Sequence, residues 1–327
     1  MSSVDLRRGA LVAVRNPSEI LATLDAHGTV AGLPFMPEMA AYCGRRFVVD
    51  YRADRMCDTV NYTGSRKLPD SVLLADMRCD GSSHGGCQAE CRFYWKEIWL
   101  RKVSPDAPPE SPVDASDLKA LVDFTSSHVK REVERQGRRQ DRWVCQHTEL
   151  LTATSLLRTF DPRTYIGQYT NGNVSLGRCV RVTARAAVEE SLDKLGLMPK
   201  VFMHGTAAQS PPYEPLNLQP GEWVEIRSKD EIAATLNAEG NNRGLWFDRE
   251  MAAFCGGKFR VRQRIERFID DFKDNGKLVE MKSDAVTLDG VVCSGELSLH
   301  RWFCPRQIYP YWRDCWLRRV PPPDNRD

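Results

Sequence analysis

The first hundred residues of this chain recur, in altered form, as its last hundred. Residues 9–49 align with residues 221–261 without a gap, at a constant offset of 212, and about half of the aligned positions are identical. The ends of the two segments match again, because Trp99-Leu100-Arg101 corresponds to Trp316-Leu317-Arg318. Such a duplication provides an internal alignment of two copies. It separates residues that the fold needs twice from residues that occur in one copy only.

Composition and charge narrow the class of protein. Of the 327 residues, 42% are hydrophobic and 28% are charged, which is typical of soluble globular proteins with two to three domains. The net charge of +2 gives no general attraction to nucleic acid or to an anionic membrane. No apolar stretch approaches the roughly 20 residues of a membrane span, and the first residues lack the apolar core of a signal peptide. We therefore expect a cytoplasmic protein without nucleic-acid or membrane partners.

The duplication predicts three domains: an N-terminal metal-binding β module at 1–105, a helical insert with Pro-rich linkers at 106–210, and a second β module at 211–327. Short apolar strands separated by Gly and Pro turns favour small β-barrels for the two modules. The Pro-Gly turn before the strand at 222–226 is typical of an SH3-like or KOW-like barrel. The predicted fold class is α+β, with two homologous SH3-like β-barrel modules flanking a mainly helical insert.

Individual elements follow from local patterns. The runs at 10–14, 46–51 and 222–226 are rich in β-branched and aromatic residues and predict strands. In the insert, apolar residues at helical spacing predict helices over 117–135 and 184–195.

The cysteine content is unusual for a cytoplasmic chain. Disulfides are disfavoured in that compartment, and the odd number of eleven cysteines cannot pair completely. Clustered cysteines therefore favour metal or redox chemistry. The thiols that recur, with one histidine per copy, are Cys43, Cys79, His84 and Cys87 in the first copy and Cys255, Cys293, His300 and Cys304 in the second.

Three thiolates and one imidazole form the soft donor set that suits Zn²⁺. The glycines at positions 81, 85 and 86 allow the first ligand loop to curl. We therefore predict two zinc ions per chain, one in each Cys3His module. The alternative is that these thiols are buried and act as small hydrophobic side chains.

Two cysteines of the first module have no thiol counterpart in the second. Cys57 aligns with Ile269, and Cys91 aligns with Ile308. Both are candidates for catalysis, in a modified metal site, in a redox thiol pair, or in iron or iron–sulfur ligation by four of the module's five thiols. A helix over residues 87–91 would place Cys87 and Cys91 on one face. The alternative is that Cys57 and Cys91 pack in the core, as their apolar counterparts imply.

A further cysteine and histidine lie close together in the insert. Cys145 and His147 are two positions apart, a spacing that permits metal chelation or a nucleophile with its base. Without a third partner in the sequence, such a pair is more often a coincidence of composition.

Two segments carry a resemblance to known proteins. Residues 79–91 read CDGSSHGGCQAEC, and residues 304–313 read CPRQIYPYWR. Both resemble segments of a group of uncharacterised bacterial proteins that are rich in cysteine and internally duplicated, and the likeness reaches the insert at Cys145-Gln146. The resemblance implies a bacterial cytosolic metalloprotein of specialised metabolism. It transfers no catalytic residue.

Two functions compete. The sequence contains no phosphate loop, dinucleotide fingerprint or metalloprotease helix, and closed Cys3His sites leave no coordination position for a substrate. These features favour a zinc-binding protein with a binding or accessory role and a protein partner. The alternative is a metal- or thiol-dependent biosynthetic enzyme that acts on a small molecule at a cleft between the first module and the insert. The differences between the two copies favour this alternative, because duplicated modules often keep a structural metal site in one copy and a catalytic site in the other.

Overall fold

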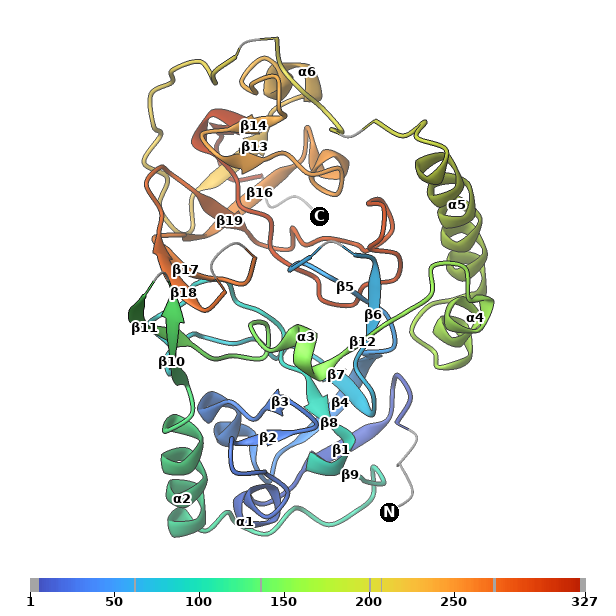
Figure 1. Cartoon of the computed structure of the whole chain (residues 1–327), viewed down its shortest axis with the longest axis vertical. Coiled ribbons are helices and arrows are strands. Elements are labelled where there is room, and N and C mark those ends of the chain that lie inside the picture. The colour runs from blue at the N-terminus through green and yellow to red at the C-terminus, as the bar shows by residue number, and fades with distance from the viewer. Residues whose placement is uncertain are drawn as a thin grey trace.

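The computed structural model describes residues 6–61, 63–135, 137–199, 201–206, 208–272 and 275–323. Its architecture is a set of small antiparallel sheets with few helices (Figure 1). The two largest sheets have the strand orders β8-β7-β4-β1-β9 and β19-β16-β13-β20, and they lie in the lower and upper parts of Figure 1. No helix in the described part of the chain has the length and apolar character needed to cross a membrane.

The two modules contain matching elements. The first has β1 (Leu11–Val14), α1 (Pro17–Leu21), β2 (Thr29–Val30), β3 (Leu33–Pro34), η1 (Pro37–Tyr42), β4 (Arg46–Arg52), β7 (Ser71–Leu74), β8 (Trp95–Lys96), η2 (Glu97–Trp99) and β9 (Leu100–Lys102). The second has β13 (Trp223–Ile226), α6 (Lys229–Ala233), β14 (Asn241–Asn242), β15 (Leu245–Trp246), η3 (Met251–Phe254), β16 (Lys258–Arg264), β19 (Val286–Leu288), η4 (Asp314–Trp316) and β20 (Leu317–Arg319). The strands expected at 10–14, 46–51 and 222–226 are confirmed as β1, β4 and β13.

Strand register is the same in the two sheets. Val12 pairs with Phe47, and Val224 pairs with Phe259, so both partners shift by 212 positions. A β-bulge follows Val49 in β4, and another follows Val261 in β16. Because a slip of one residue would turn every side chain to the opposite face, equal registers place equivalent residues on equivalent faces.

The cores of the two modules are built around equivalent aromatic contacts. Phe35 packs edge-on against Trp99 with ring centroids 5.1 Å apart, and Phe247 packs in the same way against Trp316 at 5.4 Å. All four rings are buried. Edge-to-face aromatic pairs of this kind add about 0.5–1.5 kcal/mol to the burial of their area.

The prediction of SH3-like barrels is wrong, because no closed barrel is found in the described residues. The first sheet is open, and its edge strands β8 and β9 are two and three residues long. The 3-10 helix η2 lies between them in the chain and carries it from one sheet edge to the other. In the described strand order, β8 pairs with β7 and β9 pairs with β1 at opposite edges of the sheet.

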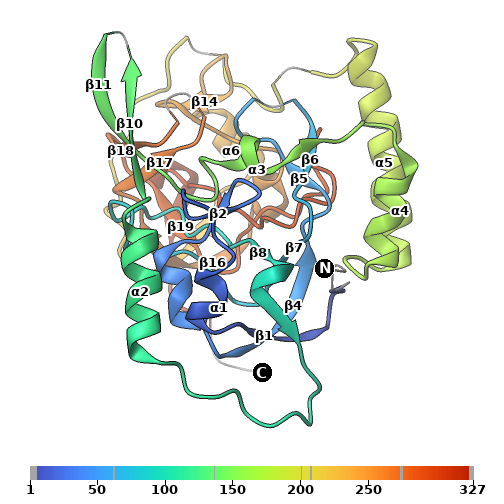
Figure 2. The ribbon, with the colours of Figure 1, turned by 60° about the horizontal axis from the view of Figure 1, so that its bottom comes forward.

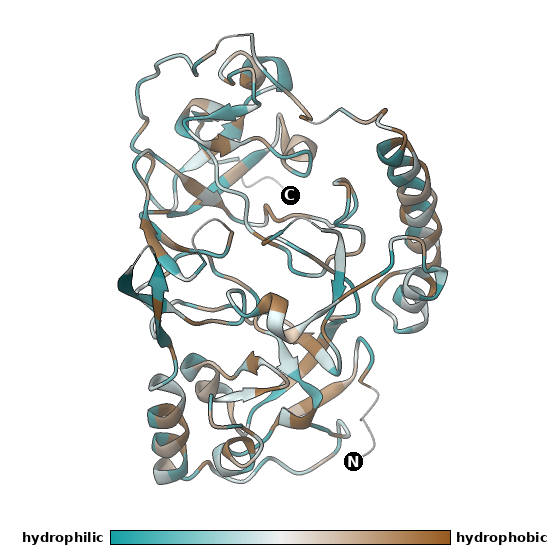
Figure 3. Cartoon of the chain, in the orientation of Figure 1, coloured by the Kyte–Doolittle hydropathy of each residue, from teal (hydrophilic) through white to brown (hydrophobic). Residues whose placement is uncertain are grey.

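The prediction of a mainly helical insert also needs correction. The helix expected over 117–135 ends at Ser126 as α2 (Ala115–Ser126), and the chain continues as the hairpin β10 (Lys130–Arg135) and β11 (Arg138–Trp143). Gly137 in the turn has a φ of 70°, a conformation that favours glycine. Figure 2 shows the hairpin projecting beyond α2, and Figure 3 shows it as hydrophilic in contrast to β1.

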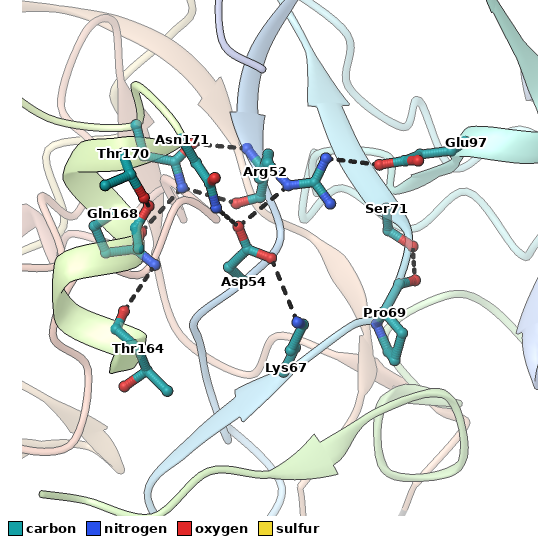
Figure 4. Close-up of polar contacts among 12 residues, drawn as sticks. Arg52, Asp54, Lys67, Pro69, Ser71, Glu97, Thr164, Gln168, Thr170 and Asn171 are labelled. Carbon is teal, nitrogen blue, oxygen red and sulfur yellow. Dashed lines mark hydrogen bonds and ion pairs between the residues drawn. The ribbon is translucent and has the colours of Figure 1, made fainter. Parts of the chain in front are cut away.

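The rest of the insert contacts both modules. It contains α3 (Leu150–Ala153), β12 (Ser155–Leu156), α4 (Pro162–Thr170) and α5 (Leu176–Lys194), and α5 includes most of the helix expected over 184–195. β12 pairs with β6 (Ser65–Lys67) of the first module, and Glu190 bonds to His300 and Trp302 of the second. Figure 4 shows how the end of α4 is attached. The Asn171 side chain donates to Asp54 Oδ2 at 2.6 Å, and Arg52 forms an ion pair with Glu97 at 2.6 Å.

Two loops join the modules in opposite directions. The loop after Cys87 reaches the second module, where Glu90 forms a two-point ion pair with Arg262 at 2.6 and 2.8 Å. The loop after Cys304 reaches the first module, where Arg306 donates to Thr59 Oγ1 at 2.9 Å. The remaining small strands β5 (Met56–Cys57), β6 (Ser65–Lys67), β17 (Arg267–Asp270) and β18 (Lys277–Glu280) lie beside this boundary.

The sulfur atoms at the starts of these loops make equivalent contacts. Cys87 Sγ accepts a hydrogen bond from the backbone N–H of Ile269 at 3.3 Å, and Cys304 Sγ accepts one from that of Cys57 at 3.2 Å. Residues 57 and 269 are related by the offset of 212. Each module therefore receives one cysteine of the other module at the same place.

Candidate functional site

A cavity of about 370 Å³ lies at the boundary between the modules. Seven of the eleven cysteines line it, together with two of the six histidines. The lining thiols and imidazoles are Cys57, Cys79, Cys87, Cys91, Cys145, Cys293, Cys304, His84 and His147. The volume lies in the range of small-molecule sites. This concentration of sulfur and imidazole makes the cavity the candidate functional site.

The loop from Cys79 to Cys87 is positioned by backbone geometry. Arg78 and Arg92 form an isolated antiparallel bridge, which fixes both ends of the loop. Gly81 has a φ of 71°, and a Cβ atom built there would lie 2.1 Å from the carbonyl oxygen of Cys87. Only glycine fits that close approach. The sequence therefore folds the loop tightly enough to bring Cys79 and His84 to the same point.

Glu38, Cys79 and His84 form a compact polar group at the cavity wall. Nδ1 of His84 lies 3.0 Å from Glu38 Oε1, and Nε2 of His84 lies 3.4 Å from Cys79 Sγ. Cys79 Sγ lies 4.0 Å from Glu38 Oε1. In the described part of the chain, this is the one group of three acidic, Cys or His residues whose potential ligand atoms all lie within 4.8 Å of one another.

The charge state of this group follows from burial and hydrogen bonding. Burial raises the pKa of Glu38, but hydrogen bonds from His84 and Ser83 outweigh it, and the carboxyl pKa lies below its ordinary value. Burial, and next the Glu38 carboxylate, raise the pKa of the Cys79 thiol well above its ordinary value. A cation at this point would remove that penalty, because metal binding favours the thiolate.

Glu38 differs from Glu250, its equivalent in the second module. Glu250 is fully engaged, because Oε2 accepts from the backbone and hydroxyl of Ser294 and Oε1 accepts from the backbone of Leu297. Glu38 Oε2 is buried and has no hydrogen-bond partner among the described residues. The first module thus leaves a carboxylate oxygen free where the second uses it to hold a loop. A buried acceptor without a partner fits an ion or a ligand.

Two kinds of chemistry fit this arrangement. Thiolate, imidazole and carboxylate are all zinc ligands, and three protein ligands leave a fourth position for water or substrate. Alternatively, Cys79, His84 and Glu38 stand in the order nucleophile, base and orienting carboxylate. In both cases Glu38 fixes the orientation of the imidazole, because it contacts the nitrogen that faces away from Cys79.

The structure separates the other predicted ligands of the first module. Cys87 lines the cavity, but its sulfur accepts from Ile269 of the second module. Cys43 follows directly after η1 and packs in the hydrophobic core, where burial raises its pKa to about 12. Cys79 and His84 are therefore brought together, with Glu38 as an additional partner, and Cys43 lies apart from them.

The second predicted set is also distributed over several places. His300 is directed to α5, with Nδ1 at 2.9 Å from Glu190 and Nε2 at 3.6 Å from Asp193. Cys293 and Cys304 line the cavity. Cys255 follows η3, at the position equivalent to Cys43. A zinc ion bound by Cys255, Cys293, His300 and Cys304 stays a prediction of the sequence.

The one-copy cysteines Cys57 and Cys91 both line the cavity. Cys91 is not helical, since its carbonyl accepts from the backbone of Cys79 at 2.8 Å in an extended pair. Ile308 accepts from the backbone of Cys293 in the same way at 3.0 Å. These contacts confirm that Cys91 and Ile308 occupy equivalent places. Cys57 lies against Cys304, with the two sulfur atoms 3.2 Å apart.

Cys145 and His147 both line the cavity, and His147 contacts Arg306 there. Nδ1 of His147 accepts a hydrogen bond from the Arg306 guanidinium, so the ring proton is on Nε2. Nε2 is buried and finds no hydrogen-bond partner in the part of the chain that the structure describes. Burial and the nearby Arg306 charge hold the pKa of His147 well below its ordinary value. His147 is therefore a neutral donor available to a ligand, while burial raises the pKa of Cys145 to about 12.

Comparison with known proteins adds no relative. No protein-family model matches the sequence, and no curated protein matches it significantly.

Two site residues, Glu38 and Arg306, are absent from the sequence-based predictions. Glu38 was detectable, because it is identical in the two copies as Glu38 and Glu250. The sequence marks Arg306 only weakly, because it differs from its counterpart in the first copy, Ala89.

Proposed function

We propose that this protein is a metal-dependent enzyme that acts on a small organic molecule in the cavity between its two modules. The observation that supports this most is the concentration of seven cysteines and two histidines around one cavity. A purely structural set of thiols has no need to surround a space of ligand size. In this proposal the active site lies between the modules and includes residues 145–148 of the insert.

The ion would be held by Cys79 and His84, with Glu38 either as a third ligand or as the partner that orients the imidazole. Zinc suits these donors, and its open position would polarise a substrate oxygen or activate a water molecule. Iron is the alternative metal. An iron–sulfur cluster is a further alternative, because Cys79, Cys87, Cys91 and Cys145 line the same cavity and such clusters take four thiolates.

The cavity also indicates the class of substrate. Phe268, Phe272 and Tyr311 contribute aromatic surface to its lining. His147 contributes a buried N–H donor and Arg306 a buried guanidinium, and neither His147 Nε2 nor Arg306 Nε has a hydrogen-bond partner among the residues described. A molecule with an apolar body and an acceptor group such as a carboxylate complements this lining.

Elemental analysis with an absorption spectrum tests the proposal. We expect the purified chain to contain a metal ion that Cys79→Ala removes, while Cys293→Ala, the equivalent change in the second module, leaves the ion in place. A colourless protein with zinc supports the mononuclear site, and a brown protein with iron and sulfide supports the cluster. Wild-type protein that contains no metal after purification and after zinc addition would overturn the proposal.

A second function is supported by the order of the polar group. Cys79, His84 and Glu38 match the arrangement of a cysteine nucleophile with its base and orienting carboxylate. In that case Cys79 reacts with a haloacetamide in metal-free protein, and His84→Gln, which removes the base, slows the reaction. The accessory role expected from closed Cys3His sites is the remaining alternative, and it requires an ion in the second module that Cys293→Ala removes.

A further inference from the structure

A second pair of side chains in the cavity is independent of Glu38, Cys79 and His84. Cys57 and Cys304 come from different modules, and their sulfur atoms lie 3.2 Å apart. Both residues are buried, with exposed fractions of 3% and 4%, and both line the cavity. The two thiols therefore share one space with any molecule bound there.

The thiol of Cys57 is not required to build the module boundary. At the equivalent position the second module has Ile269, whose backbone N–H makes the same contact to a cysteine sulfur of the other module. An apolar side chain is sufficient at this place in the fold. The sulfur of Cys57 thus adds a chemical capacity that the packing does not explain.

A positive charge accompanies the thiol pair. Arg306 Nη1 lies 3.7 Å from Cys57 Sγ and 3.4 Å from the carbonyl oxygen of Cys57. The equivalent position of the first module is Ala89, so the guanidinium is present only at the boundary that has two thiols. The Cys304 thiol also donates to Cys57 Sγ. A guanidinium and a thiol donor both stabilise a thiolate, which is the reactive form of cysteine.

The distance between the sulfur atoms permits a bond between them. A disulfide has an S–S distance of about 2.05 Å, so the two atoms need to approach by about 1 Å. Formation of the bond requires a movement of this size between the two side chains. Cys57 is then the attacking thiol, and Cys304 is the resolving thiol.

We propose that Cys57 and Cys304 form a thiol–disulfide exchange site for a small organic disulfide that enters the cavity. The Cys57 thiolate attacks one sulfur of the substrate, forms a mixed disulfide, and releases the first half of the substrate as a thiolate. Cys304, after losing its proton to that thiolate, attacks Cys57 Sγ and releases the second half, which takes a proton from solvent. The substrate disulfide is reduced to two thiols, and the two cysteines are oxidised to one disulfide. A low-molecular-weight thiol reverses both steps and restores the dithiol.

Mass spectrometry of the full-length folded chain tests this site, with bis(2-hydroxyethyl) disulfide as the probe. The expected products are a peptide pair linked through Cys57 and Cys304 and two molecules of 2-mercaptoethanol per chain. Cys304→Ala should stop the reaction at the mixed disulfide on Cys57, and Cys57→Ala should abolish it. Cys315→Ile is the matched control, because the equivalent position in the first module is Ile98, and it should react like the wild type.

Two results would overturn the proposal. One is a folded wild-type chain that forms no Cys57–Cys304 link at any probe concentration. The other is protection of both thiols by a bound metal that a chelator removes, since the pair would then be metal ligands. The Cys57–Cys304 link is measured on both metal-free and metal-loaded protein. A protein that binds no metal at Cys79 can therefore be distinguished from one whose Cys57 and Cys304 do not react. Circular dichroism of the Cys57→Ala variant establishes that it is folded.

Discussion

The sulfur atoms of Cys57 and Cys304 lie 3.2 Å apart although 247 positions separate the two residues in the chain. Each belongs to a different module, and Cys304 packs within the hydrophobic core of the first. This contact shows that the two modules are not structurally independent units. Each module extends a loop into the other, and most of the cysteines line the cavity at this boundary.

The tight loop between Cys79 and Cys87 gives a prediction about stability. Gly81→Ala should destabilise the chain by more than about 3 kcal/mol, because a Cβ atom there would overlap the backbone of Cys87. Gly9→Ala is the control, since Gly9 has a φ of 86° and a Cβ atom added there would have no neighbour within 4 Å. Its cost should be about 1 kcal/mol from backbone conformation alone. Equal urea midpoints for the two variants would contradict the described loop geometry.

The contact between His300 and Glu190 predicts how stability depends on pH. The hydrogen bond to Glu190 raises the pKa of His300. Burial raises the pKa of Glu190, but hydrogen bonds from His300 and Trp302 outweigh it, and the net shift is downward. The His300 contribution is complete below the unfolded pKa of about 6.5 and is lost as pH rises through the raised folded value. The Glu190 contribution is complete above about 4.3 and is lost as pH falls through the lowered folded value.

The measurement is urea unfolding of wild type and His300→Gln between about pH 6 and pH 9. The wild type should lose more stability over this interval than the variant, because the variant has no imidazole to deprotonate. If His300 is instead a zinc ligand, rising pH strengthens the site, since metal ligands must be deprotonated. A wild type that gains stability over the interval in the presence of zinc would therefore favour the Cys3His prediction.

Removal of the metal should expose some thiols and not others. Treatment of the folded chain with a chelator should increase alkylation of Cys79, which lines the cavity, because a bound thiolate is released. Cys43 should stay unlabelled, because it is buried in the hydrophobic core and lies outside the cavity lining. Peptide mass spectrometry before and after chelation measures both. Chelator-dependent labelling of Cys43 together with Cys79 would restore Cys43 as a ligand.

The elements that the sequence predicts well are those with strong local patterns. β1 follows from a short apolar run and β4 from a β-branched and aromatic run, and the equal registers of the two sheets agree with the offset of the duplication. The prediction of a helix over 117–135 is wrong after Ser126, because the polar strands of the hairpin lack the apolar alternation that marks a strand and Gly137 allows the turn between them. The barrel prediction fails because it depends on how edge strands meet, which no local pattern encodes.

The candidate site was predictable only in part. Cys79 and His84 were found because thiols and a histidine recur in the two copies. The identity of Glu38 and Glu250 marks both positions but gives no sign of their different tasks, because the same side chain contacts His84 in one module and holds a loop in the other. The meeting of Cys57 with Cys304 depends on exchange of loops between modules, and residues so distant in sequence carry no signal of such a contact.

The metal affinity of matched glutamate variants tests the account most directly. Zinc is titrated against a chelating indicator in wild type, Glu38→Gln and Glu250→Gln. Because Glu38 contacts His84 and has a free oxygen, Glu38→Gln should weaken binding by about 10–100-fold. Glu250→Gln should leave the affinity unchanged, since Glu250 bonds only to Ser294, Leu297 and their loop. Equal affinities for all three proteins, or no zinc binding by the wild type, would contradict a metal centre at Glu38, Cys79 and His84.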